Sequence, residues 1–262
     1  MTPKKKEIFG LNDPEKDNTF GRSQADGVDL NCDMGEELAN DGLLMPYISS
    51  ANVACGYHAG SLETMYKTIG LAVKHHVSVG AHVSYLDKNN FGRTELNLPA
   101  AEVYELVEQQ LIICKEITDL FDIKLTHIKP HGALYNQSAK DTALANTIAR
   151  AAKDFDQHLI LFGLSGSHSI REAELLGLKT ASEVFADRSY QDDGSLTPRS
   201  QQNALIEDVQ KAVDQVLQML NEGTVTAVSG KTIPIVAQTI CIHSDGIHAV
   251  EFARAIHDAI TK

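Results

Sequence analysis

Residues 125–136 read LTHIKPHGALYN, and this stretch holds the pattern that decides the fold: a short apolar run with a polar motif directly after it. The apolar run, residues 125–128, is typical of a buried β-strand. The polar motif contains Lys129 and His131 and begins where the strand is expected to end. In both directions from this stretch, the same succession of strand, polar motif and helix returns.

Short apolar runs alternate with amphipathic stretches along most of the chain. The runs cover residues 28–32, 48–54, 77–81, 125–128, 159–162, 179–184 and 239–242. Between them, apolar residues recur at helical spacing, for example in 103–117, 205–220 and 249–260. A strand followed by a helix, repeated about seven times, predicts an α/β fold with a parallel sheet. Because no glycine-rich dinucleotide loop is present, we predict a closed or nearly closed barrel rather than a Rossmann sheet. A smaller β-hairpin is predicted for residues 224–235, with its turn at 229–231.

The length and composition set the broad class of the protein. A chain of 262 residues suits one large domain, which we place at residues 27–262. Residues 1–26 are polar and show no periodicity, so they are predicted to form a flexible N-terminal extension.

The net charge of −12 argues against nucleic acid or an anionic membrane surface as the main partner. No run of about 18 apolar residues occurs. No apolar segment follows the basic N-terminus either, so the cytoplasm is the expected location. The four cysteines form no C-x-x-C pair and are expected to be free thiols.

Polar motifs follow almost every strand-like run, and a parallel barrel gathers these strand ends on one face. The sequence therefore predicts one polar cleft. Imidazoles suit proton transfer near neutral pH, and four of them follow a run: His58, His82, His131 and His243. Asp33 and Glu36 lie on either side of Gly35, which permits a tight turn beside a ligand.

Other polar residues at these strand ends have two readings each. Lys129 either holds a carboxylate or phosphate, or braces a neighbouring aspartate. The adjacent Asp187 and Arg188 either anchor a loop or bind an anion. Asn31 alternates with apolar neighbours, so it either contacts a ligand or satisfies backbone groups at the strand end.

The motifs at the strand ends resemble those of the LamB/YcsF family. The matching segments, which run from Asp29 to Asp245, are DLNCDMGE, SSANVACGYHAG, GAH, FGR, HIKPHGALYN, EVFADRSY, DGSLTPR and ICIHSDG. The resemblance implies an irregular seven-stranded (β/α) TIM-like barrel, similar to the polysaccharide deacetylase fold. It also implies hydrolysis of 5-oxo-L-proline to L-glutamate coupled to ATP hydrolysis, together with subunits B and C. Three positions depart from the family pattern: Ser61 replaces Asp, Val83 replaces Pro, and Ser244 replaces Gly.

The implied reaction assigns expected roles to the polar residues. Proton transfer falls to the four histidines, whereas Asp33, Glu36 and Asp245 activate water or hold a metal. Lys129, Arg93 and Arg188 supply cations for phosphate and the substrate carboxylate. The expected substrate- or phosphate-binding set is Asn31, Asn52, Arg93, Lys129, Asp187 and Arg188. ATP, with Mg²⁺, is the expected cofactor. The sequence has no P-loop, so ATP binds either mainly to a partner subunit or at a non-standard site.

Two alternatives to this function remain open from the sequence. The chain could be a stand-alone, metal-dependent amidase of the deacetylase kind, with Asp33, His58 and His82 as ligands of zinc or a similar ion. It could also be a non-catalytic subunit that only presents substrate to its partners. Association of the chain into a homo-oligomer is compatible with all three readings.

Overall fold

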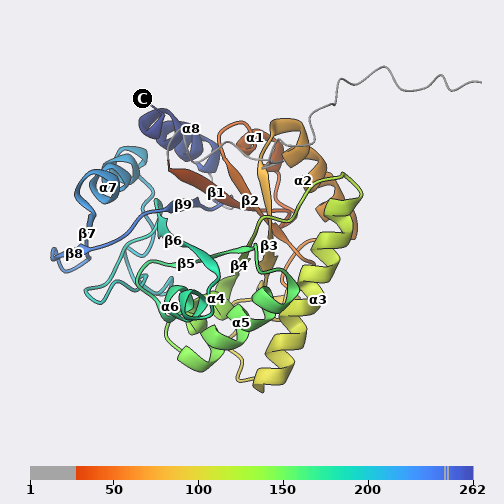
Figure 1. Cartoon of the computed structure of the whole chain (residues 1–262). Helices are drawn as coiled ribbons and strands as arrows, with labels where there is room; N and C mark the ends of the chain where they lie inside the picture. Colours follow the sequence, from red (N-terminus) through yellow and green to blue (C-terminus); the bar gives the residue numbers. More distant parts are fainter. Residues whose placement is uncertain (1–27, 245, 247, 262) are drawn as a thin grey trace, which may run out of the picture.

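The computed structural model describes residues 28–244, 246 and 248–261. Its centre is a closed barrel of parallel strands in the order β1-β2-β3-β4-β5-β6-β9 (Figure 1). The strands are β1 Asp29–Met34, β2 Ser50–Ala54, β3 Ser78–Val83, β4 His127–Pro130, β5 Ile160–Leu164, β6 Lys179–Phe185 and β9 Thr239–Ile242. The predicted seven-stranded (β/α) barrel is therefore confirmed. The predictions for residues 1–26 and for Asp245 lie outside the described residues.

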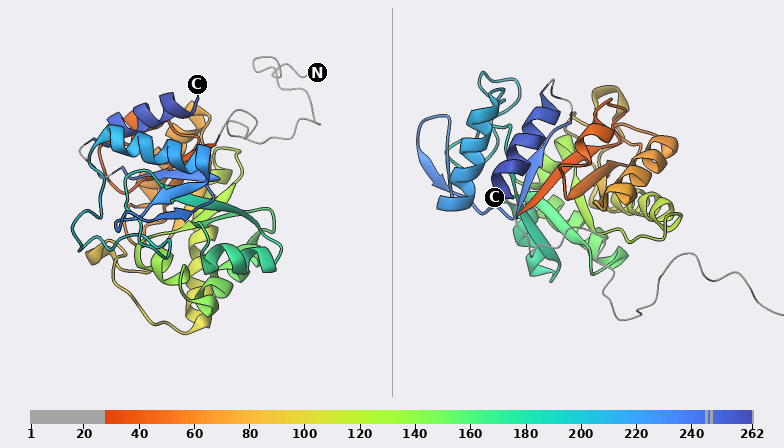
Figure 2. Two further views of the ribbon diagram at one scale, coloured as in Figure 1. Left: turned by 90° about the vertical axis from the view of Figure 1, so that its left-hand side faces the viewer. Right: turned by 90° about the horizontal axis from the view of Figure 1, so that it is seen from above.

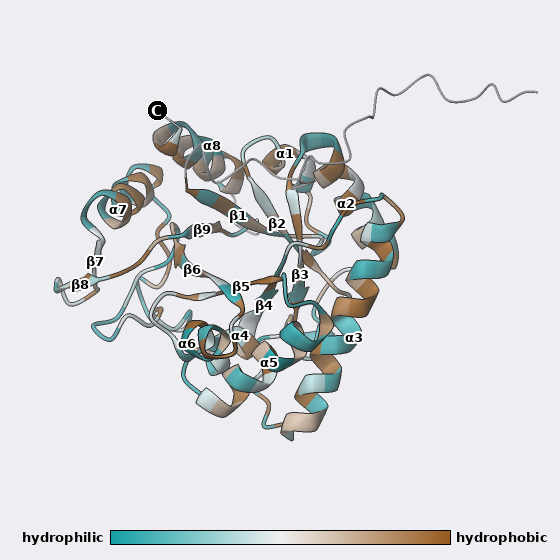
Figure 3. Ribbon diagram, in the orientation of Figure 1, coloured by the Kyte–Doolittle hydropathy of each residue, from teal (hydrophilic) through white to brown (hydrophobic). Residues whose placement is uncertain are grey.

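Helices follow the strands and cover the outside of the barrel (Figure 1). They are α1 Asp41–Leu44, α2 Leu62–His75, α3 Ala100–Asp119, α4 Gly132–Ser138, α5 Thr142–Phe155, α6 His168–Leu175, α7 Val209–Glu222 and α8 Ala249–Ile260, with a short 3-10 helix, η2, at Lys88–Asn90. In Figure 3, helices such as α3 carry both hydrophobic and hydrophilic stretches, as expected for helices with one face on the barrel. No helix within the described part of the chain is long and apolar enough to cross a membrane.

The predicted hairpin is also present, outside the barrel. β7 Thr224–Thr226 pairs antiparallel with β8 Thr232–Pro234. The turn between them contains Gly230, whose φ of +86° is accessible to glycine at little cost. Figure 2 shows this hairpin beside α7, away from the barrel strands.

The barrel strands separate apolar from polar side chains by alternation. In β1, Leu30, Cys32 and Met34 are buried in the hydrophobic core shared with the helices. The alternate residues Asn31 and Asp33 are also buried, but they make hydrogen bonds with side chains from other barrel strands. The same alternation places His127, Lys129 and Glu183 inside the barrel, where Phe162 stacks on the ring of His127.

Several strands continue further than their apolar runs suggested. β1 extends to Met34 and β3 to Val83, so Asp33 and His82 lie within strands rather than in the loops after them. Both residues belong to parallel strand pairs, in which Asp33 is opposite Asn52 and His82 is opposite Lys129. The strands therefore fix the backbone of these two residues, which lie at the carboxyl end of the barrel.

Candidate active site

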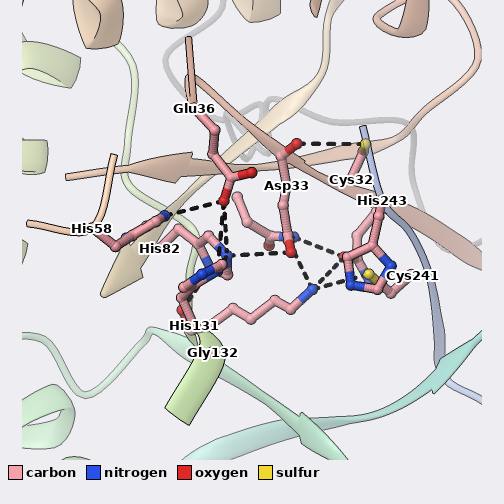
Figure 4. A network of polar contacts seen from close by, with 12 residues as sticks. Cys32, Asp33, Glu36, His58, His82, His131, Gly132, Cys241 and His243 are labelled. Atoms are coloured by element: carbon pink, nitrogen blue, oxygen red, sulfur yellow. Dashed lines mark hydrogen bonds and ion pairs between the residues drawn. The ribbon is translucent and has the colours of Figure 1, made fainter. Parts of the chain in front are cut away.

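Three histidines and a glutamate meet at the carboxyl end of β1 to β4, and we call Glu36, His58, His82 and His131 the histidine cluster. Glu36 Oε1 lies 3.0 Å from His58 Nε2 and 3.5 Å from His131 Nδ1. His131 Nδ1 lies 2.8 Å from His82 Nε2. The rings of His58 and His131 stack, with centroids 3.9 Å apart. The four side chains point toward one another (Figure 4), and all four are buried.

Local backbone features bring the cluster together. Gly35, with φ of +71°, turns the chain after β1 so that Glu36 faces the barrel axis. His131 is the N-cap residue of α4. Gly92 adopts φ of +65° next to both rings, and a Cβ there would lie 2.8 Å from the His58 Cβ. The FGR motif therefore packs against the cluster through a position that only glycine suits.

The environment lowers the pKa of two of these histidines. Burial lowers the pKa of His58. Burial also holds the pKa of His131 well below its usual range, and the neighbouring rings of His58 and His82 add to this effect. Both shifts favour the neutral form of these rings.

Lys129 lies at the centre of a second group of polar side chains, inside the barrel. Its Nζ lies 2.8 Å from Asp33 Oδ1 and 2.8 Å from Glu183 Oε1. It also lies 3.1 Å from Cys241 Sγ. Burial alone would lower the pKa of Lys129, but Asp33, Cys241 and Glu183 together outweigh it, and the pKa ends well above its usual range. His82 and Lys129 in turn hold the pKa of Asp33 well below its usual range, against the effect of burial. Lys129 thus braces Asp33, one of the two roles predicted for it.

Asn31 and Asn52 were expected to bind substrate or phosphate, and the structure places them elsewhere. Neither lines the pocket described below. Asn52 donates to Asn31 Oδ1 and to Asp33 Oδ1, and Asn31 donates to Glu183 Oε1 and Thr239 Oγ1. Both are fully buried. They hold the charged residues of the barrel interior in place, and their role in ligand binding stays a prediction.

His243 and Asp187 form a separate pair on another side of the site. His243 Nδ1 lies 2.8 Å from Asp187 Oδ2. Burial alone would lower the pKa of His243, but the Asp187 carboxylate outweighs it and raises the pKa above its usual range. Asp187 itself has a lowered pKa, because His243 outweighs the effect of burial. The side chain of Asp187 is therefore occupied by His243 and anchors it.

Arg188 anchors a loop, one of the two roles predicted for it. Its guanidinium donates to the carbonyl of Ala204 at 3.2 Å and to that of Thr197 at 2.7 Å. Burial lowers the pKa of this guanidinium. These bonds hold the segment that follows β6 against the barrel end, and Arg188 also lines the pocket there.

A pocket of about 450 Å³ lies over the barrel end and brings most of the predicted residues together. Of the predicted set, it is lined by Asp33, Glu36, His82, Arg93, Lys129, His131, Arg188 and His243. His58 contributes from behind, through Glu36 and His131, and is not in the lining. The sequence interpretation did not single out the lining residues Glu95, Tyr135, Lys140 and Arg199.

The charge of the pocket is opposite to that of the whole chain. Cationic groups in the lining are Arg93, Lys129, Lys140, Arg188 and Arg199, against the carboxylates of Asp33, Glu36 and Glu95. A protein with a net charge of −12 thus concentrates positive groups at one site. This arrangement favours a small anionic ligand.

Two groups of side chains have the spacing of metal ligands. One is the histidine cluster, and the other is Asp33, Cys241 and His243, each with its ligand atoms within 4.8 Å of one another. The predicted set of Asp33, His58 and His82 is divided between them. Asp33 contacts His82, at 3.2 Å, but its other oxygen is held by Lys129.

Comparison with known proteins extends these findings. Residues 28–262 match the LamB/YcsF family. The A subunit of 5-oxoprolinase from Tolumonas auensis is 49% identical over 238 residues, which cover 89% of this chain and 95% of the relative. The protein of the same name from Staphylococcus carnosus is 47% identical over 240 residues, 90% of this chain and 95% of the relative. Among solved structures, the lactam utilization protein from Thermus thermophilus has a TM-score of 0.83 at 39% identity, covering 89% of this chain and 95% of that one. The similarity extends over nearly the full length of these proteins.

Proposed function

The chain belongs to the LamB/YcsF family, and from this premise we propose that it is the A component of a 5-oxoprolinase, which hydrolyses the cyclic amide 5-oxo-L-proline to L-glutamate. Relatives that share about half of its residues carry this name. The observation that carries the proposal is the pocket, whose lining combines several cationic side chains, which we call the cationic wall, with residues of two separate histidine–carboxylate groups. A lactam with one carboxylate needs a cation to hold it and proton-transfer groups on both sides of its amide bond.

The substrate carboxylate fits the cationic wall. Arg188 is already fixed by two backbone carbonyls, so it loses little further freedom when it binds an anion. Arg199 and Lys140 line the same pocket. With the carboxylate there, the ring lies between the histidine cluster and His243.

Ring opening requires a proton on the amide nitrogen as the C–N bond breaks. His243 is suited to donate it, because Asp187 holds its Nδ1 and raises its pKa. The histidine cluster, which lines the pocket through Glu36, His82 and His131, is suited to activate the attacking water. The water adds to the carbonyl carbon, the nitrogen leaves as the amine, and glutamate results.

Amide resonance makes an unactivated lactam a poor electrophile, so we propose that the reaction is coupled to ATP with Mg²⁺. ATP would supply phosphorylation of the amide oxygen with release of ADP, which makes the carbonyl carbon a good electrophile. Addition of water and cleavage of the C–N bond then leave an acyl phosphate, and a second water releases inorganic phosphate and gives the glutamate carboxylate. The cations of the pocket suit a phosphorylated substrate. Because the sequence lacks a P-loop, we propose that the nucleotide binds mainly to the partner subunits B and C. The cytoplasmic location remains a prediction of the sequence.

The proposal is tested by an assay of glutamate release from 5-oxoproline and ATP. The chain is assayed alone and together with candidate subunits B and C, and release is expected only from the complete set. Absence of release under every combination would overturn the proposed function. If Asp33→Ala and His131→Ala leave turnover of the complete set unchanged, the chain is instead a non-catalytic component that presents substrate.

The histidine cluster is also compatible with one alternative function, that of a stand-alone, metal-dependent amidase. This activity needs both a bound transition metal and hydrolysis without ATP. Glutamate release by the isolated chain in the absence of ATP would support it against the proposal above.

A further inference from the structure

Two ring nitrogens in the histidine cluster face each other, and the other nitrogen of each ring is held by a backbone carbonyl. His82 Nδ1 lies 3.0 Å from the carbonyl oxygen of Lys129. A carbonyl oxygen only accepts, so this nitrogen carries the hydrogen. His131 Nε2 lies 3.0 Å from the carbonyl oxygen of Phe91, so it carries a hydrogen too. The other two ring nitrogens, His82 Nε2 and His131 Nδ1, point at each other and lie 2.8 Å apart.

Glu36 adds a carboxylate to the same centre. Its Oε1 lies 3.9 Å from His82 Nε2 and 3.5 Å from His131 Nδ1, and Asp33 Oδ2 lies 3.2 Å from His82 Nε2. His58 Nε2 lies 3.0 Å from the same oxygen. Lone pairs that converge in a buried site repel one another unless a positive charge lies between them. The centre therefore calls for a proton or a metal ion.

We propose that the histidine cluster binds one divalent transition metal ion, with Glu36, His58, His82 and His131 as its ligands. Metal–ligand bonds of about 2.1 Å in a tetrahedral site place neighbouring ligand atoms roughly 3.4 Å apart. The four distances of 2.8, 3.0, 3.5 and 3.9 Å lie on both sides of this value. Three imidazoles and one carboxylate suit Zn²⁺, Co²⁺ or a similar ion better than Mg²⁺ or Ca²⁺, which favour oxygen ligands.

The surroundings of the rings resemble those of metal-bound histidines. Such histidines usually donate their second ring N–H to a carbonyl or carboxylate, which fixes the ring orientation. His82 and His131 both do so, through the carbonyls of Lys129 and Phe91. The ion would face the pocket, since Glu36, His82 and His131 line it, and there it would polarise a carbonyl or a water molecule.

The other group with ligand spacing does not need an ion. Asp33, Cys241 and His243 lie within 4.8 Å of one another, but the ammonium of Lys129 is 2.8 Å from Asp33 and 3.1 Å from Cys241. This cation already supplies the positive charge. The inference thus assigns the ion to one of two neighbouring groups, and it rests on ring orientation rather than on the identity of the substrate.

Cobalt binding tests the inference directly. The full chain is stripped with a chelator and titrated with Co²⁺, and the bound metal is measured by elemental analysis and by visible d–d absorption. We expect about one Co²⁺ per chain, without the sulfur-to-metal charge-transfer band that Cys241 would add. His131→Gln and Glu36→Gln are each expected to weaken binding at least about 10-fold. The matched control His243→Gln, which removes a histidine from the other group, is expected to bind Co²⁺ as the wild type does.

Circular dichroism shows which variants are folded, and the two cluster variants give independent readings if one of them fails to fold. The inference is overturned if the folded wild type binds no stoichiometric Co²⁺, or if both cluster variants bind it normally. It is also overturned if His243→Gln abolishes binding. None of these readings depends on glutamate release, so failure of the metal site and failure of the proposed function are distinguishable.

Discussion

Asp187 contacts His243 rather than its neighbour in the sequence, Arg188. Its carboxylate accepts from the backbone N–H of His243 at 3.3 Å and contacts Nδ1 at 2.8 Å. Arg188 instead donates to carbonyls 9 and 16 residues further along the chain. From the sequence alone, the opposite charges of Asp187 and Arg188 suggest an ion pair between these neighbours. In the structure the two side chains support different parts of the site.

The Asp187–His243 contact predicts the effect of Asp187→Asn on pH dependence. The carboxylate raises the pKa of His243, so the protonated ring persists to higher pH than in a free histidine. Without the charge, the ring loses its proton at lower pH. The high-pH limb of kcat/KM for glutamate release should move to lower pH, and kcat should fall by about 10²- to 10⁴-fold if His243 is the acid.

The measurement is the pH–rate profile of the complete set of subunits, compared with that of Asp214→Asn. Asp214 is an exposed carboxylate on α7 that accepts a hydrogen bond from Gln210. Its substitution should leave the profile unchanged. A profile of Asp187→Asn with the wild-type high-pH limb would remove His243 from the role of general acid.

Ser61 shows why a departure from the family pattern need not disturb the site. It is the N-cap residue of α2, and its hydroxyl accepts from the backbone N–H of Thr64 at 3.2 Å. Serine and aspartate are both good N-cap residues. The hydroxyl of Ser61 therefore does the capping work that the aspartate expected from the family pattern would do.

At the scale of elements, the sequence was sufficient to find the barrel strands but not to find what they enclose. The apolar runs located each of the seven strands, because buried strands need a run of apolar side chains on their outer face. The residues that face the barrel interior could not be identified from the sequence, since polar residues such as Glu183 and His127 look like strand interruptions or loop residues. Their burial depends on partners more than 50 residues away, as in the contact between Lys129 and Glu183.

The same reason explains which site residues were found. The histidine cluster and Lys129 follow strand-like runs directly, so their position in the sequence marked them. Lys140 follows helix α4, and Arg199 lies in the long loop between β6 and α7. Their approach to the pocket depends on how those segments fold back. The one available signal was that Arg199 belongs to the DGSLTPR motif.

The close approach of Gly80, on strand β3, to the ring of His127 leads to a prediction about packing inside the barrel. A Cβ on Gly80 would lie 2.1 Å from the ring of His127 on the neighbouring strand β4. Gly80→Ala must therefore displace the ring or the strand, which should lower the free energy of unfolding by about 1–3 kcal/mol. In the background of His127→Ala, which removes the ring, the same substitution should cost clearly less.

Urea unfolding of the wild type, the two single variants and the double variant gives the coupling energy between these positions. A coupling of at least about 0.5 kcal/mol is expected for residues in such contact. Additive effects would show that the glycine is not required for the close approach of the ring.

At the scale of the whole molecule, the barrel interior links folding to protonation. Most globular domains fill their centre with apolar side chains, whereas this barrel encloses Lys129, Glu183, Asp33 and His127. Each charge has a partner of opposite sign, as buried charges require. His127 differs, because it is buried as a neutral ring that accepts or donates at Thr126 and Asn52.

His127 therefore makes the stability of the protein depend on pH. Burial, with the charges of Lys129 and His82, lowers its pKa to about 3. An unfolded chain protonates this ring near pH 6.5, the ordinary value for histidine, so between about pH 6.5 and 3 the unfolded state holds one more proton. Because the pKa of His127 is lower in the folded state, its contribution to the free energy of unfolding is complete above the pKa of the unfolded chain. This contribution is lost as the pH falls toward the pKa of the folded state. His127 alone should reduce the free energy of unfolding by up to about 1.4 kcal/mol per pH unit in this window.

Urea unfolding between pH 7 and 5 measures this contribution of His127. We expect His127→Gln to remove that part of the slope of the unfolding free energy against pH, because glutamine does not titrate there. The exposed His158→Gln is the matched control and should leave the slope nearly unchanged. Equal slopes for His127→Gln and the wild type would mean that the ring is protonated inside the barrel, and the polar interior would then carry one more positive charge than its hydrogen bonds indicate.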